Sequence, residues 1–374
     1  MPEILSAAAC NLDSNILAAC LPLMEESRLE AIEWSFDALF NVKDIPSWFL
    51  ELLTAYSHEK RLTGHGVFFS LFSGKWRQEQ ADWLKRLKKI NSTFRFDHVT
   101  EHFGFMTGKD FHHGAPLNIP YTPTTLRIGQ DRLKRIFEAC ECPVGLENLA
   151  FSYSLEEVKK HGAFLEQLLE PVNGFIILDL HNLYCQIHNF NIPFEEILAL
   201  YPLHKVREIH ISGGSWQPAP DNPVKKIRRD THDDAVPEEV FALLEHTIAR
   251  CPHLKYVVLE QLGNALYTAN SKHLFYTDFG RMEKIVQANN KIHKAVSLQT
   301  FLPLSPIING AVIEDETLNA QQLELSRILE SAHSHHEAIY RLSQSSLAHS
   351  AWQVEEWEPD MIATAVSIAQ KWKK

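Results

Sequence analysis

Histidine and acidic residues recur along the chain, each time at or just after a short apolar run. The best-defined case is residues 174–184, where the apolar run 175–178 ends in Asp179, His181 and Asn182. A buried strand that carries such groups at its carboxyl end is how an α/β barrel places catalytic side chains. Similar groups follow other apolar runs: His65, His102, Glu147, His210, Asp230, His232 and Glu260.

Each of these residues alone has an ordinary structural explanation. Asp179 could cap the turn that follows it, His181 could lie in solvent, and His65 could be a hydrogen-bonded core histidine. Repetition at successive strand ends favours a functional centre instead, because unpaired buried charge is costly.

Imidazole and carboxylate ligands with almost no thiolate suit iron, zinc or manganese. One metal ion takes three or four protein ligands, so this set predicts about two or three metals that share a bridging carboxylate. The six cysteines are scattered and form no paired CxxC motif, which favours a reducing cytoplasm over a disulfide framework.

These side chains must be positioned by alternating strands and helices. Apolar runs predict eight strands, within residues 4–10, 30–36, 62–71, 94–103, 143–149, 175–180, 206–211 and 255–259. Helical spacing predicts intervening helices at 14–24, 46–58, 78–90, 127–140, 154–169, 194–201 and 237–250. This order predicts an α/β fold, a (β/α)8 TIM barrel that is complete by about residue 290.

Two segments fall outside this pattern. The loop 104–125, with His112 and His113, has the length of a lid or binding loop. Residues 291–374 are polar and helical in pattern, at 318–332, 335–342 and 361–372, and they contain Trp352, Trp357 and Trp372. We therefore divide the chain into a metal-binding catalytic barrel, 1–290, and a helical C-terminal extension, 291–374. The tryptophans either seal the barrel or anchor a peptide, a partner protein or a second copy of the chain.

Composition narrows the function. The chain of 374 residues has 45% hydrophobic residues and a net charge of −11, which disfavours binding to a nucleic acid backbone. No apolar run reaches the roughly 18 residues of a membrane span, and the N-terminus has no basic region of a secretion signal, so we expect a cytoplasmic protein without membrane contact.

Several segments together resemble the multinuclear non-heme iron-dependent oxidases, the family that includes the methanobactin-biosynthesis oxidase. The motifs that carry the resemblance are GHGVFFSL at 64–71, VTEHF at 99–103, LEN at 146–148, LDLHNLY at 178–184, EIHISG at 208–213 and DTH at 230–232 with AVP at 235–237. The resemblance covers about residues 3–265. It implies a xylose-isomerase-like TIM barrel with two or three irons that uses O2 to modify a ribosomally made precursor peptide, commonly at cysteine. It also implies a separate peptide-recognition partner.

The resemblance assigns ligands motif by motif. His65, His102 and Glu147 would hold one metal, and Glu147 would bridge to a second metal held by Asp179, His210 and Glu260. Asp230, His232 and Asn182 would hold a third, which should be labile because an amide oxygen is a weaker ligand than imidazole. Glu147, Asp179 and His210 would form the catalytic set.

Two other classes fit part of the pattern. A metal-dependent hydrolase or sugar isomerase of the same superfold, such as a trinuclear-zinc AP endonuclease, would share the ligands. A nuclease would need more basic loops than the single run Lys225, Lys226, Arg228 and Arg229. The third class is a non-catalytic, metal-dependent scaffold that presents the C-terminal helices to a partner.

Overall fold

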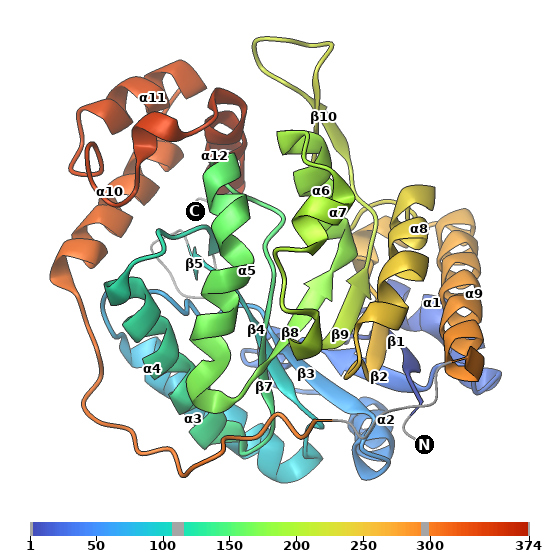
Figure 1. Cartoon of the computed structure of the whole chain (residues 1–374). Coiled ribbons are helices and arrows are strands. Elements are labelled where there is room, and N and C mark those ends of the chain that lie inside the picture. Colours follow the sequence, from blue (N-terminus) through green and yellow to red (C-terminus); the bar gives the residue numbers. More distant parts are fainter. Residues whose placement is uncertain (1–2, 107–115, 293–298, 373–374) are drawn as a thin grey trace.

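Eight parallel strands form a closed barrel at the centre of the molecule (Figure 1). The computed structural model describes residues 3–106, 116–292 and 299–372; His112 and His113, and the side chain of Trp372, lie outside the described part. In barrel order the strands are β1 (Leu5–Ala9), β2 (Ala31–Trp34), β3 (Leu62–Gly66), β4 (Val99–His102), β7 (Val144–Glu147), β8 (Phe175–Asp179), β9 (Val206–Ile211) and β12 (Tyr256–Leu259). The predicted barrel is confirmed, and β12 closes it by pairing with β1.

Alternate residues of each strand face the barrel interior. The amino-terminal part of the interior includes Tyr256 and Val258 of β12 and Phe175 and Ile177 of β8, which surround the buried pair of His98 and Glu208. Gly145 leaves room for the Phe175 ring, since a Cβ at this position would lie 2.5 Å from it. One step further along the same inward faces, the side chains become imidazoles and carboxylates.

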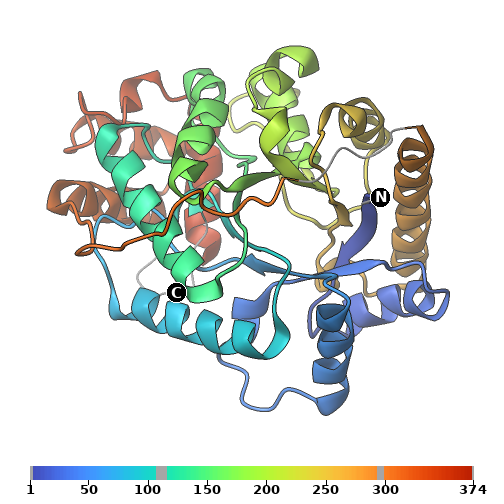
Figure 2. The ribbon, with the colours of Figure 1, turned by 60° about the horizontal axis from the view of Figure 1, so that its bottom comes forward.

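Helices surround the barrel (Figures 1 and 2). They are α1 (Ser14–Glu25), α2 (Ser47–His58), α3 (Gln78–Phe94), α4 (Pro123–Cys140), α5 (Leu155–Leu169), α6 (Leu180–Phe190), α7 (Phe194–Leu198), α8 (Glu238–Thr247) and α9 (Ala269–Ile292). No described helix has both the length and the apolar character needed to cross a membrane.

Helix α6 was missing from the sequence prediction. It begins directly after β8, and Leu180, Leu183, Tyr184 and Ile187 have the i, i+3, i+4, i+7 spacing that could have revealed it. Asp179 is its N-cap and accepts a hydrogen bond from the backbone N–H of Asn182 at 2.6 Å. The capping explanation for Asp179 is therefore correct, and the strand turns into the helix without a loop.

Several strands are shorter than predicted. Strand β3 ends at Gly66, so His65 lies at its carboxyl end rather than inside a longer run. The predicted loop 104–125 contains a short antiparallel pair, β5 (Phe105–Met106) with β6 (Pro116–Leu117). A second pair, β10 (Trp216–Pro218) with β11 (Lys226–Arg228), forms a hairpin between β9 and α8.

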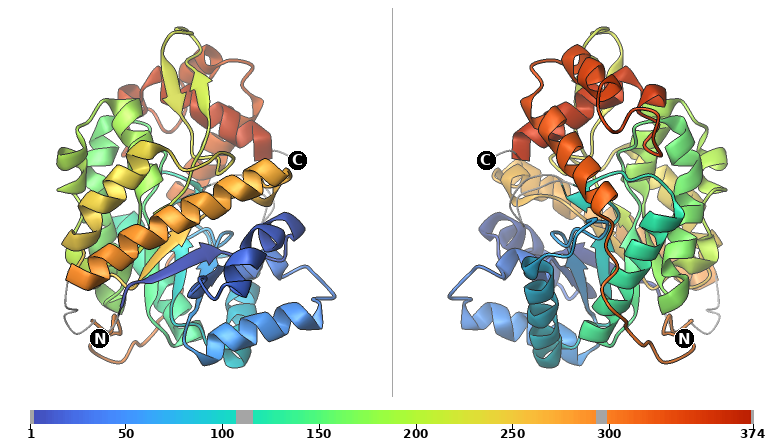
Figure 3. Two further views of the ribbon diagram at one scale, coloured as in Figure 1. Left: turned by 90° about the vertical axis from the view of Figure 1, so that its right-hand side faces the viewer. Right: turned by 90° about the vertical axis from the view of Figure 1, so that its left-hand side faces the viewer.

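The C-terminal region returns across the barrel. Residues 299–315 begin at the amino-terminal end of the strands and continue along the outside of the barrel to α10 (Figures 1 and 2). The fully buried Phe301 packs against Phe175 with ring centroids 5.7 Å apart. The chain then forms α10 (Glu316–Ser331), α11 (His335–Ser343) and α12 (Pro359–Trp372), which lie at the opposite end of the barrel (Figures 1 and 3).

Trp352 and Trp357 are buried between this extension and the barrel. Trp357 stacks on Tyr153 with ring centroids 3.6 Å apart, and Trp352 meets Phe105 edge-on. Both indole N–H groups donate hydrogen bonds, to Gln321 Oε1 and to the Trp352 carbonyl. These two rings therefore join the extension to the barrel.

Candidate metal centre

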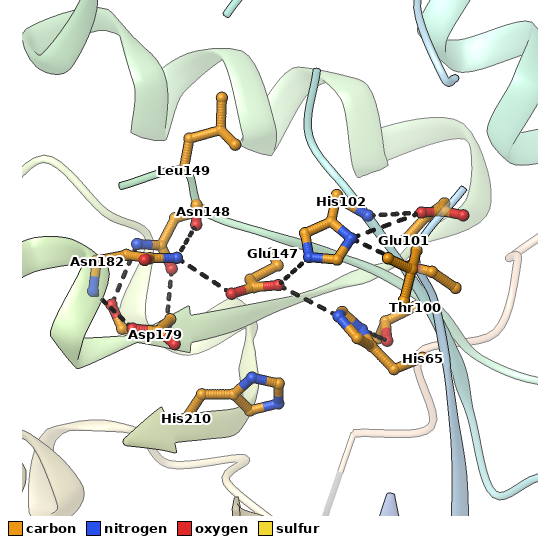
Figure 4. Close-up of polar contacts among 12 residues, drawn as sticks. His65, Thr100, Glu101, His102, Glu147, Asn148, Leu149, Asp179, Asn182 and His210 are labelled. Carbon is orange, nitrogen blue, oxygen red and sulfur yellow. Dashed lines mark hydrogen bonds and ion pairs between the residues drawn. The ribbon is translucent and has the colours of Figure 1, made fainter. Parts of the chain in front are cut away.

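The inward-facing polar side chains meet at the carboxyl end of the strands, around Glu147 (Figure 4). Oε2 of Glu147 lies 3.4 Å from Nε2 of His65 and 3.3 Å from Nε2 of His102. The three residues come from β3, β4 and β7, which are neighbours in the barrel. They form one group of mutually close ligand atoms, with His65 and Glu147 buried.

Glu147 also belongs to a second group. Ligand atoms of Glu147, Asp179, His210 and Glu260 all lie within 4.8 Å of one another, and the four residues are buried. Strand register accounts for part of this, because Asp179 pairs with His210 across β8 and β9. The structure thus places Glu147 between the two ligand sets that the sequence motifs indicated.

Hydrogen bonds to the outer ring nitrogens orient the histidines of the first group. Nδ1 of His65 lies 2.8 Å from Oγ1 of Thr100, whose hydroxyl donates to the Gly64 carbonyl, so the hydroxyl must accept from His65 Nδ1–H. Nδ1 of His102 lies 3.2 Å from the Gly66 carbonyl. Both contacts leave Nε2 directed at Glu147, as is usual for metal-binding histidines.

His210 is held in the opposite sense. Its Nε2 lies 3.0 Å from Oε1 of Glu208 and 3.2 Å from Oε2 of Glu33. Its Nδ1 makes no hydrogen bond, although Oε2 of Glu260 lies 3.2 Å away. The Nδ1 atom is therefore the one available to bind a metal ion, and Glu208 fixes the ring orientation through Nε2.

Asp179 and Asn182 each use part of their polar group structurally. Oδ1 of Asp179 caps α6, whereas its Oδ2 is buried without a hydrogen-bond partner. Nδ2 of Asn182 donates to Oε1 of Glu147 at 3.1 Å and to the Asn148 carbonyl at 2.7 Å, whereas its Oδ1 is also buried without a partner. Two acceptors around Nδ2 fix the amide orientation.

Asp230 and His232 form a pair beside this centre. Oδ1 of Asp230 lies 2.8 Å from Nε2 of His232 and 3.0 Å from Nδ1 of His181. His181 is fully buried, contrary to the solvated alternative, and its Nε2 accepts hydrogen bonds from the Arg228 guanidinium. Because Arg228 can only donate, His181 must carry its proton on Nδ1 and donate it to Asp230.

Among the described residues, Asp230 and His232 do not belong to any group of three or more His, Cys, Asp or Glu side chains whose ligand atoms lie close together. The amide oxygen of Asn182 is another buried atom without a hydrogen-bond partner among the described residues.

Concentrated negative charge shifts several pKa values. Burial raises the pKa of Asp179 well above its ordinary value, and the carboxylates of Glu147 and Asp230 raise it further. Burial lowers the pKa of His65, but the carboxylates of Glu33 and Glu147 outweigh this effect and raise the pKa to about 10. Without a bound cation, the raised pKa values of Asp179 and His65 favour their protonated forms, and a bound cation would displace these protons.

These donors fit a metal centre. Buried polar atoms without hydrogen-bond partners are rare in folded proteins, yet Asp179 Oδ2 and Asn182 Oδ1 are of this kind near Glu147, and His210 Nδ1 has only the nearby carboxylate of Glu260 among the described residues. Imidazole nitrogens and carboxylate oxygens are ligands that iron, zinc and manganese accept. A cation here would satisfy atoms that the protein leaves unpaired.

A family model described as "RiPP precursor modification enzyme MbnB/TglH/ChrH" matches residues 27–268 of this chain. That range contains every candidate ligand from His65 to Glu260. The chain belongs to this family. As a member of the MbnB/TglH/ChrH family it is an enzyme that acts in the modification of a ribosomally made precursor, and its α10–α12 extension lies outside the matched range.

Curated relatives of this MbnB/TglH/ChrH member include several UPF0276 proteins. A "UPF0276 protein" of Caulobacter vibrioides is 26% identical over 203 residues, which is 54% of this chain and 69% of the relative. UPF0276 protein AM1_3026 of Acaryochloris marina is 27% identical over 209 residues, 55% of this chain and 71% of the relative. A solved L-ribulose 3-epimerase aligns with TM-score 0.50 at 12% identity over 78% of this chain and 96% of that chain, which shows a shared barrel fold alone.

Sequence reasoning missed the residues that orient the ligands. Glu208 could have been found, because it lies two residues before His210 and so shares its inward face. Glu33 and Thr100 occupy inward positions on β2 and β4, but a single polar residue in a strand is not distinctive. The contact of Arg228 with His181 joins the hairpin to α6, and no local sequence pattern predicts such a contact between distant segments.

Proposed function

We propose that this protein is a multinuclear iron-dependent oxidase that uses O2 to modify a ribosomally made precursor peptide at cysteine. His65, His102 and Glu147 would hold one iron, and Glu147, Asp179, His210 and Glu260 a second. Bound iron would supply a Lewis acid for a thiolate and electrons for oxygen chemistry. Membership of a precursor-modifying family supports the peptide substrate.

The observation that carries this proposal is the position of Glu147. Its Oε2 approaches two imidazoles of the first group, and the same carboxylate belongs to the second group of four ligands. One carboxylate common to two groups is the arrangement expected of a bridging ligand, and a mononuclear isomerase or hydrolase does not need it.

The surrounding residues hold and orient the side chains that would bind the metals. Thr100 and the Gly66 carbonyl fix the rings of His65 and His102. Asn182 donates to the oxygen of Glu147 that the two imidazoles do not approach, so both carboxylate oxygens are constrained. We propose that Asn182 Oδ1, Asp230 and His232 hold a third iron, with His181 and Arg228 fixing the Asp230 carboxylate.

Metal analysis of anaerobically purified protein tests the proposal directly. After iron supplementation we expect about two or three irons per chain. Zinc in place of iron would favour the hydrolase, and turnover of a sugar would favour the isomerase. Fewer than about one metal per chain, or a folded metal-loaded protein that never consumes oxygen with any cysteine-containing precursor, would contradict the oxidase.

Substitution tests the bridge. Glu147→Gln removes a charged ligand from both groups, so both metals should be lost together. Asp230→Ala is the matched control, because it should empty only the third position. Full metal content and activity in Glu147→Gln would show that Glu147 does not bridge.

We further propose that the outer surface of the α10–α12 extension contacts a peptide-recognition partner, with a homodimer as the alternative. Leu323 and Tyr340 are exposed apolar residues of this surface, at 51% and 67% exposure. Truncation near residue 300 is a poor test, because the extension is part of the core through Phe301 and Trp357. Leu323→Ser with Tyr340→Ser should weaken partner binding and leave metal content unchanged; unimpaired binding would contradict the proposal.

A further inference from the structure

A separate cluster of side chains that could bind a metal lies away from the barrel centre. Asp221, in the turn of the β10–β11 hairpin, faces His335 and His336 in the first turn of α11. Nε2 of His335 lies 2.8 Å from Oδ2 of Asp221, and Nε2 of His336 lies 3.6 Å from Oδ1. The two imidazole rings are 4.0 Å apart between centroids. Two imidazoles from one segment thus converge on the carboxylate of another.

Other contacts hold the hairpin against α12 without the histidines. Ala219 and Ile227 of the hairpin form a buried apolar cluster with Met361 of α12. Lys225 pairs with Asp360 at 2.5 Å. Because α12 also packs on α11, these contacts hold the backbones that carry Asp221 and the two histidines close together.

We propose that Asp221, His335 and His336 form a peripheral site for a divalent late transition metal such as zinc. Two imidazoles and one carboxylate with one open position are a ligand set that zinc uses in proteins. The Asp221 and His336 side chains are 59% and 69% exposed, so a metal and a water molecule have access. A bound ion would fasten the hairpin to the extension, whereas a hydrogen-bonded histidine–aspartate pair needs only His335.

The site has a structural consequence for the barrel centre. The hairpin ends in β11 at Arg228, whose guanidinium donates to His181, and His181 contacts Asp230. A metal at Asp221 would restrain the same hairpin at its other end. The site is independent of the proposed function, since no central ligand takes part in it.

The experiment measures zinc in the iron-loaded enzyme. Wild type, His336→Ala and His349→Ala are each incubated with a slight excess of zinc, desalted, and analysed for both metals. His336 is exposed, and its one polar contact with the described residues is to Asp221, so its loss should not affect folding. His349 is the matched control, because it is 89% exposed and its side chain pairs with Glu355 alone within the described part of the chain.

We expect wild type and His349→Ala to retain one more zinc per chain than His336→Ala, with the same iron content in all three. Replacement of iron by zinc at the barrel centre would occur equally in each protein, so it cancels when the zinc contents of wild type and His336→Ala are compared. Equal zinc in wild type and His336→Ala would overturn the proposal, whatever the centre contains.

Limited trypsin digestion provides a second readout of the same site. Cleavage after Lys226, which lies within β11, requires the hairpin to open. Zinc at ten times its dissociation constant should slow this cleavage about tenfold in wild type. The rate in His336→Ala should not change with zinc, and an equal slowing in both proteins would contradict a metal that fastens the hairpin.

Discussion

Replacing Thr100 by valine should weaken metal binding without altering any proposed ligand. Thr100 faces His65 across β3 and β4, and its hydroxyl connects His65 Nδ1 to the Gly64 carbonyl. Valine keeps the shape and burial of threonine but cannot accept a hydrogen bond. The His65 ring then loses the contact that directs Nε2 at Glu147.

The magnitude follows from the buried hydrogen bond that is lost. Leaving a buried donor unsatisfied costs about 1–3 kcal/mol. At about 1.4 kcal/mol per tenfold change, this corresponds to roughly 5- to 150-fold weaker binding of the metal held by His65. Losses of outer hydrogen-bond partners in other metal sites, about 10–100-fold, fall in the same range.

The assay is anaerobic competition for Fe²⁺ against a chelator of known affinity, with wild type, Thr100→Val and two controls. Thr100→Ser restores the hydroxyl and should recover most of the affinity. Thr63→Val also changes a buried threonine of this barrel region, but the Thr63 hydroxyl has no hydrogen-bond partner, so binding should not change. The reasoning fails if Thr100→Val binds as tightly as wild type, or if Thr63→Val is equally impaired.

Three further outcomes are expected. Asn182→His should raise iron content from about two towards three per chain, because imidazole is a stronger ligand than an amide oxygen; unchanged stoichiometry would count against a ligand role for Asn182. Trp357→Ala should lower the free energy of unfolding by about 3–5 kcal/mol in urea titration, whereas Trp48→Ala, at an exposed position, should have little effect. Burial raises the pKa of Asp97, but the neighbouring Arg207 and Lys255 outweigh this effect and hold the pKa at about 2, below the usual 3.8. The resulting stability of about 2 kcal/mol is present above pH 4 and lost as the pH falls through 2, so Asp97→Asn should be destabilising at pH 7 and much less so at pH 2.

Much of the fold was predictable because the strand signal was strong. Runs such as 175–178 and 206–211 are continuous and apolar, as expected of strands covered on both sides. Strand ends were harder, since the apolar residues that follow β3 and precede β4 belong to the packing of loops and of α3. Phe69 and Phe94 are buried as deeply as strand residues, so hydrophobicity could not separate them.

The candidate centre was predictable at the level of which side chains gather there. Parallel strands bring their carboxyl ends to one edge, so His65, His102 and Glu147 had to converge once the barrel was recognised. Which nitrogen of each imidazole faces inward was not predictable, because this depends on Thr100, the Gly66 carbonyl and Glu208. The contacts of the extension also escaped prediction, since they join segments far apart in sequence by packing alone.

The path of residues 299–315 determines when this protein can finish folding during synthesis. Phe301 covers the amino-terminal end of the barrel, and Asp315 bonds to the Gly74 carbonyl on the far side. β1 can pair with β12 only after residue 259 has been made, and the amino-terminal end of the barrel stays uncovered until Phe301 has followed. Contacts of such long sequence separation form slowly, and the unpaired strand edges remain exposed meanwhile. The nascent chain therefore needs protection from aggregation for most of its translation, because the segments that close and cover the barrel lie in the last third of the sequence.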